Sequence, residues 1–223
     1  MADVPVIVVS SPKPQSGNSV LALNLAGALW NDGYKVGLFS SRPSEITDFL
    51  NKRAKLIKET KAKIAKPTLI QSLNNSSDVS ALVADIGAAD YVLHEDVFSA
   101  AQTIITPLNY KDDVIWQAND KYLKFIWEVK KKQAARGIKY LNWIVVPYLK
   151  EKHSDFTAEI ESKAKLFGFK IAPAIYYRDE YMHVLNGYCA ADLINKKLEK
   201  MMNLNDVYAR REILKLTDFI WQK

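Results

Sequence analysis

Residues 6–32, VIVVSSPKPQSGNSVLALNLAGALWND, decide the fold that we expect for this chain. They open with a run of apolar, mostly β-branched residues (6–9), which predicts a short buried strand. A polar loop follows, and from Ser19 apolar residues recur at helical spacing until Gly33 ends the pattern. A strand, a polar loop and a helix in this order are typical of a phosphate-binding loop, where backbone N–H groups and the helix N-terminus hold an anion.

The remainder of the chain alternates predicted strands with predicted helices. We expect further strands at 34–39, 68–72, 90–96, 102–108, 140–147 and 169–173, and helices at 45–66, 78–86, 112–133, 154–166, 178–185 and 192–221. This alternation predicts an α/β fold, namely a doubly wound, mainly parallel sheet with helices on both faces.

The composition is that of an ordinary globular protein. The chain has 223 residues, of which 48% are hydrophobic and 25% charged, and this length predicts one domain over 1–223 with a helical C-terminal region at about 192–223. Cys189 is the single cysteine, so an intrachain disulfide is excluded. The sequence shows neither a membrane-spanning apolar run nor a signal peptide, and we therefore expect a cytoplasmic protein.

The loop resembles the deviant Walker A loop of the ParA/MinD family of P-loop ATPases, whose pattern is Lys-Gly-Gly-x-Gly-Lys-Ser/Thr. The early lysine, the last glycine and the hydroxyl are kept, but the phosphate-clamping lysine is replaced by Asn18. The resemblance implies ATP and Mg²⁺ as cofactors, with Ser19 holding the metal and Lys13 reaching toward the phosphate of a partner subunit. The nucleotide-binding residues that it implies are Lys13, Gln15, Ser16, Gly17, Asn18 and Ser19.

Two other parts of the resembling family's site are altered. The family carries aspartates at the end of its second strand, where this chain has Ser40 and Arg42. The predicted strand at 90–96 ends in acids and stands where the family keeps its Walker B and switch II residues. The family's Asp-Thr-Pro-Gly is replaced there by residues 95–98, EDVF, in which Val97 has no matching counterpart. If the site is active, the resemblance gives the catalytic roles to Lys13 and Glu95.

The second half of the chain resembles the MipZ-type division-plane positioning ATPases, a branch of the ParA/MinD family. The resemblance is carried by WE at 127–128 with the lysines after it, NWIVV at 142–146, FGFKIAP at 167–173, and YRD at 177–179 leading to Gly187 and DL at 192–193. It implies an ATP-dependent homodimer that binds DNA non-specifically, interacts with a ParB-like or division protein, and sets the position of the division ring.

The altered loop leads to two main hypotheses. Pro14 lacks a backbone N–H, Gln15 adds a Cβ where the family has glycine, and Asn18 carries no charge. Losing one preorganised donor typically costs about 10²–10³ in rate. The first hypothesis is therefore a pseudo-ATPase that acts in chromosome partition or cell-division positioning through protein and DNA contacts. The second is a slow Mg²⁺-dependent ATPase that cycles between monomer and dimer, and a different cargo in the same fold is a third.

Basic residues form two clusters in a chain whose formal net charge is +6. Each cluster fits either a phosphate-backbone or partner surface, or simply a solvated helix face. Cations near the end of the predicted helix at 112–133 also have a structural reason, because they complement the helix dipole. The candidate DNA or partner surface consists of Lys52, Arg53, Lys55 and Lys58 in the first cluster and Lys130, Lys131, Lys132 and Arg136 in the second.

Overall fold

The computed structural model describes residues 4–62, 64, 66–73, 78–109, 120–138, 141–149, 154–194 and 203–221. Within these ranges the strands form one parallel sheet in the order β3-β2-β4-β1-β5-β6-β7, and β8 also pairs with β6. The strands are β1 (Val6–Ser10), β2 (Val36–Ser40), β3 (Thr68–Leu69), β4 (Ala81–Ile86), β5 (Thr103–Asn109), β6 (Asn142–Leu149), β7 (Lys170–Ile171) and β8 (Ile175–Tyr176).

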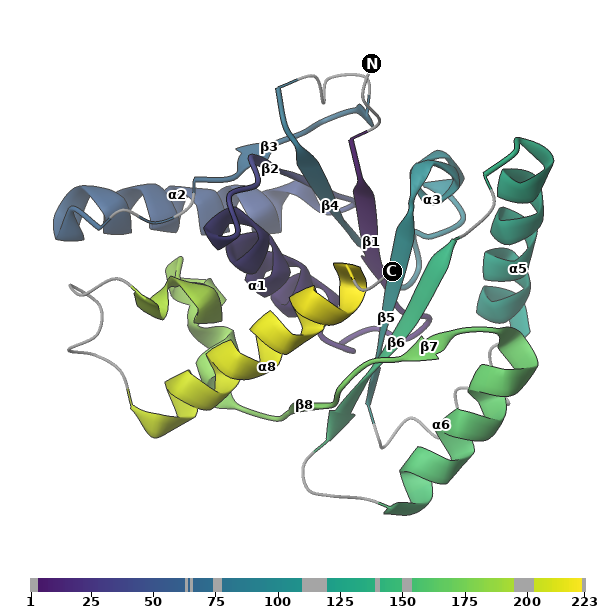
Figure 1. The fold of residues 1–223 in the computed structure, drawn as a ribbon. Coiled ribbons are helices and arrows are strands. Elements are labelled where there is room, and N and C mark those ends of the chain that lie inside the picture. The colour runs from purple at the N-terminus through teal and green to yellow at the C-terminus, as the bar shows by residue number, and fades with distance from the viewer. Residues whose placement is uncertain are drawn as a thin grey trace.

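Helices cover both faces of this sheet (Figure 1), which confirms the predicted doubly wound fold. One layer contains α1, α2 and α8 together with the 3₁₀ segments η3 and η4, and the other contains α3, α5 and α6. Their bounds are α1 (Asn18–Asn31), α2 (Pro43–Thr60), α3 (Glu95–Ala100), α5 (Asp120–Ala135), α6 (Ser154–Phe167), η3 (Asp179–Asn186), η4 (Ala190–Ile194) and α8 (Leu204–Trp221).

Alternate residues of the central strands enter two separate cores. Ile7 and Val9 of β1 pack in the layer that contains α1, whereas Val6 and Val8 pack in the layer that contains α3 and α5. A strand that is buried on both faces needs an apolar residue at every position, which explains the unbroken run at 6–9. This arrangement places the loop after β1 at the carboxyl edge of the sheet, where open α/β sheets bind their ligands.

The helix that we predicted over 78–86 is wrong, because residues 81–86 form the central strand β4. All six residues of β4 are buried, and the strand pairs with β1 on one side and β2 on the other. Apolar residues at 79, 82, 83 and 86 satisfy a helical spacing, but a short apolar run buried on both faces satisfies it equally well. The carboxyl end of β4 therefore lies beside the loop after β1.

The strand that we predicted at 90–96 is also wrong. Residues 90–94 form turns outside the sheet, and α3 begins at Glu95. The apolar side chains that suggested a buried strand, Val92 and Leu93, are 59% and 79% exposed. The strand end with an acid that we expected in this segment is found instead in β4, which carries Asp85 near its end.

Most other predicted elements agree with the structure apart from their bounds, but residues 179–186 form the 3₁₀ segment η3 instead of an α-helix, and β8 and α3 had not been predicted. The helix predicted to continue to residue 66 ends at Thr60. Parts of two predicted helices, residues 112–119 and 195–202, lie outside the described residues. In the described parts of the chain, no helix combines the length and the apolar composition needed to cross a bilayer.

Candidate nucleotide-binding site

The loop between β1 and α1 is a tight turn held by its own serine hydroxyls. Ser11 and Ser16 both donate hydrogen bonds from Oγ to the carbonyl of Lys13, at 3.0 and 2.8 Å. Gly17 has a φ of 88°, which is a left-handed conformation that favours glycine. Gln15 has a φ of 62° and therefore holds a strained backbone conformation at the position where the resembling family has glycine.

Asn18 turns its side chain toward the end of β4. Its Nδ2 donates to the carbonyl oxygen of Ile86 at 3.1 Å. Its Oδ1 is a buried acceptor for which no hydrogen-bond donor is found among the described residues. The residue that replaces the phosphate-clamping lysine is thus a neutral amide anchored to the neighbouring strand, and its orphaned oxygen fits a ligand that brings donors, such as a hydrated cation.

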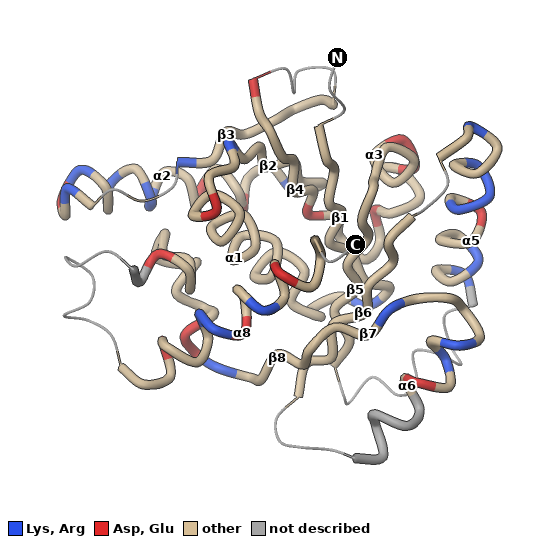
Figure 2. Tube along the Cα trace, in the orientation of Figure 1, with Lys and Arg blue, Asp and Glu red and all other residues tan. Residues whose placement is uncertain are grey.

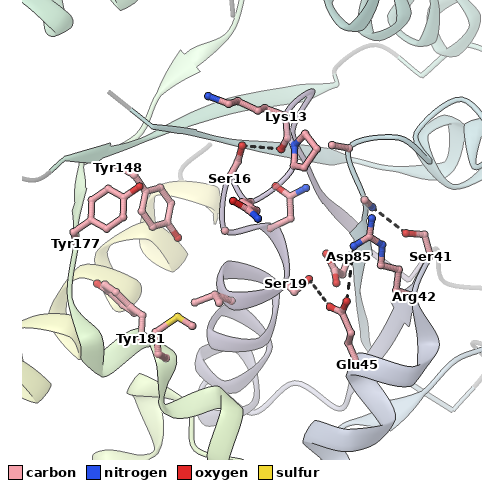
Figure 3. A pocket seen from close by; sticks show the side chains of 18 of the residues that line it. Lys13, Ser16, Ser19, Ser41, Arg42, Glu45, Asp85, Tyr148, Tyr177 and Tyr181 are labelled. Atoms are coloured by element: carbon pink, nitrogen blue, oxygen red, sulfur yellow. Dashed lines mark hydrogen bonds and ion pairs between the residues drawn. The ribbon is translucent and has the colours of Figure 1, made fainter. Parts of the chain in front are cut away.

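Two carboxylates meet the hydroxyl of Ser19 at the N-terminal end of α1 (Figure 3). Ser19 donates from Oγ to Glu45 Oε2 at 3.4 Å, and Asp85 lies at the end of β4 with 3% of its surface exposed. Burial raises the pKa of Asp85 to about 6, and the negative charge of Glu45 acts in the same direction. Hydrogen bonding from Ser19 and Ser40 lowers this pKa in part. A hydroxyl beside two carboxylates is a ligand set that suits Mg²⁺.

Hydrogen bonds connect the segment after β2 with the segment after β4 at one end of the cavity. Ser41 donates from Oγ to Asp90 Oδ2 at 2.9 Å and accepts from the backbone N–H of Gly87 at 2.9 Å. A Cβ at Gly87 would lie 2.6 Å from Asp90 Oδ2, so a larger residue at this position would displace the carboxylate of Asp90. An acid and a glycine therefore do lie at the end of a central strand, as Asp85 and Gly87, and not within residues 95–98.

Aromatic side chains line the opposite end of the cavity, which has a volume of about 790 Å³. Tyr148 comes from β6, Tyr177 follows β8, and Tyr181 lies in η3; the rings of Tyr148 and Tyr177 are 6.1 Å apart in an edge-to-face arrangement. Figure 3 shows these rings to one side of α1, with Glu45 and Arg42 on the other side. The cavity thus has an aromatic end and a charged end, joined by the loop at 13–19.

Glu212 of α8 holds the aromatic end in place. Its Oε1 accepts from Arg178 Nη2 at 2.7 Å, while its Oε2 accepts from the hydroxyl of Tyr181 at 2.7 Å and the backbone N–H of Tyr176 at 3.1 Å. One carboxylate therefore connects β8, η3 and α8. No sequence pattern indicated this role, because the partners lie 31–36 positions away from Glu212.

Replacing Glu212 with glutamine is expected to lower the free energy of unfolding by about 2–3 kcal/mol, because hydrogen bonds to a charged acceptor contribute about 1.5–3 kcal/mol each. The amide keeps one acceptor oxygen but turns an NH₂ group toward donors. Urea denaturation would measure the change. The matched control is Glu59→Gln, which removes an exposed ion pair with Lys55 and is expected to cost under about 1 kcal/mol. Equal losses in the two variants would contradict the assignment.

The structure brings together all the residues that we assigned to the loop but leaves Glu95 outside. Lys13, Gln15, Ser16, Gly17, Asn18 and Ser19 all line the cavity. Glu95 is the first residue of α3, and its carboxylate forms an ion pair with Lys132 of α5. The role that we gave to Glu95 depended on the wrong strand at 90–96. The carboxylates in the cavity near Ser19 are Asp85 and Glu45, and the residues DIG after the run ALVA at 81–84 were the signal that could have revealed the first of them.

Arg53 is buried, so our assignment of this residue to the candidate DNA or partner surface is wrong. Its side chain is 1% exposed and forms an ion pair with Asp192 at 2.6 Å. Several other basic residues of the two clusters are paired with acids on the surface, as in Lys52–Asp48, Lys55–Glu59, Lys131–Glu128 and Lys132–Glu95. Figure 2 shows the basic residues of α2 and of α5 at opposite ends of the molecule, so the two clusters do not form one continuous face.

Comparison with known proteins adds family and fold information. A family model described as ATPase MipZ matches residues 70–220, which is more than half of the chain. No curated protein sequence matches. A putative plasmid partition protein from Borrelia burgdorferi, crystallised with AMPPNP, is 14% identical, with 97% of this chain and 99% of that chain covered and a TM-score of 0.65.

Two further solved structures are similar to this chain. A cobyrinic acid a,c-diamide synthase from Mycobacterium smegmatis, with a bound ATP analogue and magnesium, is 12% identical, covers 97% of this chain and 94% of its own, and has a TM-score of 0.62. The cell division protein MinD from Aquifex aeolicus is 13% identical, covers 97% and 96%, and has a TM-score of 0.58. At these identities the similarity shows the fold, which is that of the ParA/MinD-like P-loop NTPases.

Proposed function

This chain belongs to the MipZ family of ATPases, and we propose that it is a member that binds nucleotide weakly and does not hydrolyse it. The proposal rests first on residue 18, because Asn18 is neutral and its amide is already bonded to the carbonyl of Ile86. A lysine at this position would bring a positive charge to the phosphates. Replacing a charge-assisted contact by a neutral group weakens both ground-state binding and the stabilisation of charge that develops during phosphoryl transfer.

The cavity nevertheless suits a nucleotide with Mg²⁺. The aromatic end, with Tyr148 and Tyr177, offers stacking surfaces for a base, and the loop at 15–19 offers backbone N–H groups and the N-terminus of α1 to phosphates. Ser19 and Asp85 would hold Mg²⁺. When bound, Mg²⁺ would neutralise charge on the phosphates. These features support binding even though the lysine clamp is missing.

Hydrolysis requires a group that positions and deprotonates water, and the segment after β2 offers little for this task. Ser40 accepts from the backbone N–H of Arg42 at 2.9 Å, and a guanidinium has no acceptor for a proton. The second candidate, a slow Mg²⁺-dependent ATPase, is supported by Asp85 and Glu45, which are the carboxylates beside Ser19. In that case one of them, rather than Glu95, would take the catalytic role.

The biological part of the proposal follows from family membership. We propose that the protein acts in chromosome partition or in cell-division positioning, as a cytoplasmic, single-domain P-loop NTPase-like protein. A ParB-like or division protein is the proposed partner, and homodimerisation and non-specific DNA contact are further proposals. If DNA binds, the exposed members of the basic clusters, such as Lys58 and Arg136, should carry it, and affinity should fall steeply with salt.

Calorimetric titration with ATP and Mg²⁺, combined with a phosphate-release assay, tests the proposed activity. We expect a dissociation constant on the order of 0.1–1 mM, which corresponds to about 4–5.5 kcal/mol, and no phosphate release above the protein-free rate. Lys13→Ala is the control for the loop. Mg²⁺-dependent hydrolysis that disappears in Lys13→Ala would contradict the proposal and establish the slow ATPase instead.

A further inference from the structure

We propose that Arg42 is the cation that holds phosphate in this cavity, in place of residue 18. The ligand would then be a nucleoside di- or triphosphate, and the nucleoside alone would gain nothing from this residue. The inference rests on the proposed function, because it assumes that the cavity binds nucleotide. It adds a cationic side chain to the groups proposed to recognise the phosphates.

Asn18 and Arg42 approach the same short segment at the end of β4. Asn18 donates to the carbonyl of Ile86, and Arg42 Nε lies 3.4 Å from the place where a Cβ on Gly87 would stand. Both side chains line the cavity. The lysine-to-asparagine change removes a positive charge next to residue 86, and Arg42 supplies one next to residue 87. The cavity therefore still has a positive charge beside this segment, next to residue 87 instead of residue 86.

Arg42 is held loosely enough to change partners. Its side chain is 57% exposed, and its two ion pairs, Nε to Asp90 Oδ2 and Nη1 to Glu45 Oε1, are both 3.9 Å long. These distances exceed those of hydrogen bonds, and exposed ion pairs contribute only about 0–1 kcal/mol. A guanidinium forms shorter, bidentate hydrogen bonds with phosphate oxygens. Exchanging the present carboxylate contacts for phosphate is therefore favourable.

The other arginine that lines the cavity is already committed to a structural role. Arg178 donates to Glu212 from both Nε and Nη2, at 3.2 and 2.7 Å, at the aromatic end of the cavity. Arg42 instead lies at the charged end, between Glu45 and Asp90. The same end holds Ser19 and Asp85, which are the residues proposed for Mg²⁺. A phosphate group bound with Mg²⁺ at this end would therefore lie on the side of the cavity that Arg42 lines.

Titrations of Mg²⁺ with ADP, Mg²⁺ with ATP, and adenosine into wild type and Arg42→Gln test the inference. We expect Arg42→Gln to weaken the binding of ADP and ATP by about 10- to 100-fold and to leave adenosine unchanged, because the loss concerns phosphate alone. Asn18→Lys in the Arg42→Gln background should recover most of this loss, since it returns a positive charge to the other side of the segment. Arg211→Gln, an exposed arginine of α8 outside the cavity, is the matched control and should bind all three ligands like the wild type.

The outcomes separate this inference from the proposed function. If wild type and Arg42→Gln bind ADP and ATP equally, Arg42 is not the phosphate cation, while nucleotide binding stands. A parallel loss of adenosine binding in Arg42→Gln would also overturn the inference, because the residue would then support the cavity as a whole. If the wild type binds none of the three ligands, the proposed nucleotide binding is wrong and the inference falls with it.

Discussion

Replacing Arg53 with alanine is expected to lower the free energy of unfolding by about 3–5 kcal/mol, because it removes one partner of a fully buried ion pair. Arg53 Nη1 and Nη2 donate to the two carboxylate oxygens of Asp192 at 2.6 and 2.7 Å, and Nη1 also donates to the carbonyl of Gly187 at 2.8 Å. Without the guanidinium, the Asp192 carboxylate would remain in an apolar interior with its charge uncompensated.

The same contacts connect α2 to the 3₁₀ segments η3 and η4. The substitution should therefore destabilise the packing of these segments as well as remove one ion pair. Asp192 Oδ2 also accepts from the backbone N–H of Cys189 at 2.6 Å. Gly187 approaches the backbone of Arg53 so closely that a Cβ there would lie 2.7 Å from its nitrogen. The arginine therefore organises a turn that leads from η3 to η4, and η3 carries Tyr181 of the candidate site.

Urea denaturation at neutral pH measures this effect, with Lys52→Ala as the matched control. Lys52 is the adjacent residue of α2 and pairs with Asp48 on the surface, so its removal should cost under about 1 kcal/mol. The double variant Arg53→Met with Asp192→Leu should be more stable than Arg53→Ala, since it leaves no buried charge without a partner. A loss of under 1 kcal/mol in Arg53→Ala would contradict this account.

Arg53 also shows where reasoning from the sequence reaches its limit. A basic run on a predicted helix reads as a surface, because the partner that buries Arg53 lies 139 positions away in the chain. The fold itself was predictable, because predicted strands and helices alternate along the chain after the strand, loop and helix of residues 6–32. The loop residues followed from the resemblance to the deviant Walker A loop, and the structure places them together in the cavity.

The rest of the candidate site required tertiary information. Strand β4 was predicted as a helix because six residues buried on both faces carry no alternation that would identify a strand. Because the strand lies at 81–86 and not at 90–96, the acid of the candidate site is Asp85 and not Glu95. The aromatic end draws Tyr148, Tyr177 and Tyr181 from separate segments, and no spacing in the sequence brings them together.

The second large effect is expected from Asp85→Asn, which should stabilise the Mg²⁺-free protein at pH 7 by up to about 3 kcal/mol. Burial raises the pKa of Asp85 to about 6, whereas an unfolded chain leaves an aspartate near a pKa of about 3.9. The folded protein therefore binds this proton more tightly than the unfolded chain does. The stability that it contributes is fully present below about pH 4 and is lost as the pH rises to about 6.

Denaturation of wild type and Asp85→Asn in EDTA at pH 4 and at pH 7 isolates this contribution. The two proteins should differ little at pH 4, where Asp85 is protonated, and the variant should be more stable at pH 7. Asp48→Asn, which alters an exposed carboxylate of α2, should change the stability by under about 1 kcal/mol at either pH. A variant that is no more stable than the wild type at pH 7 would show that the buried charge carries no penalty.

A buried carboxylate that destabilises the protein at neutral pH points to a ligand that compensates for it. If Asp85 and Ser19 hold Mg²⁺ with a nucleotide, binding stabilises the wild type in proportion to the logarithm of ligand concentration. Asp85→Asn should then show the opposite pattern, with higher stability in EDTA and a much smaller gain on adding Mg²⁺ and ADP. The thermal midpoints of both proteins, measured with and without about 10 mM MgADP (roughly ten times the highest dissociation constant expected), check this. Equal gains in the two proteins would remove Asp85 from the proposed metal site and leave its burial as a feature of the fold alone.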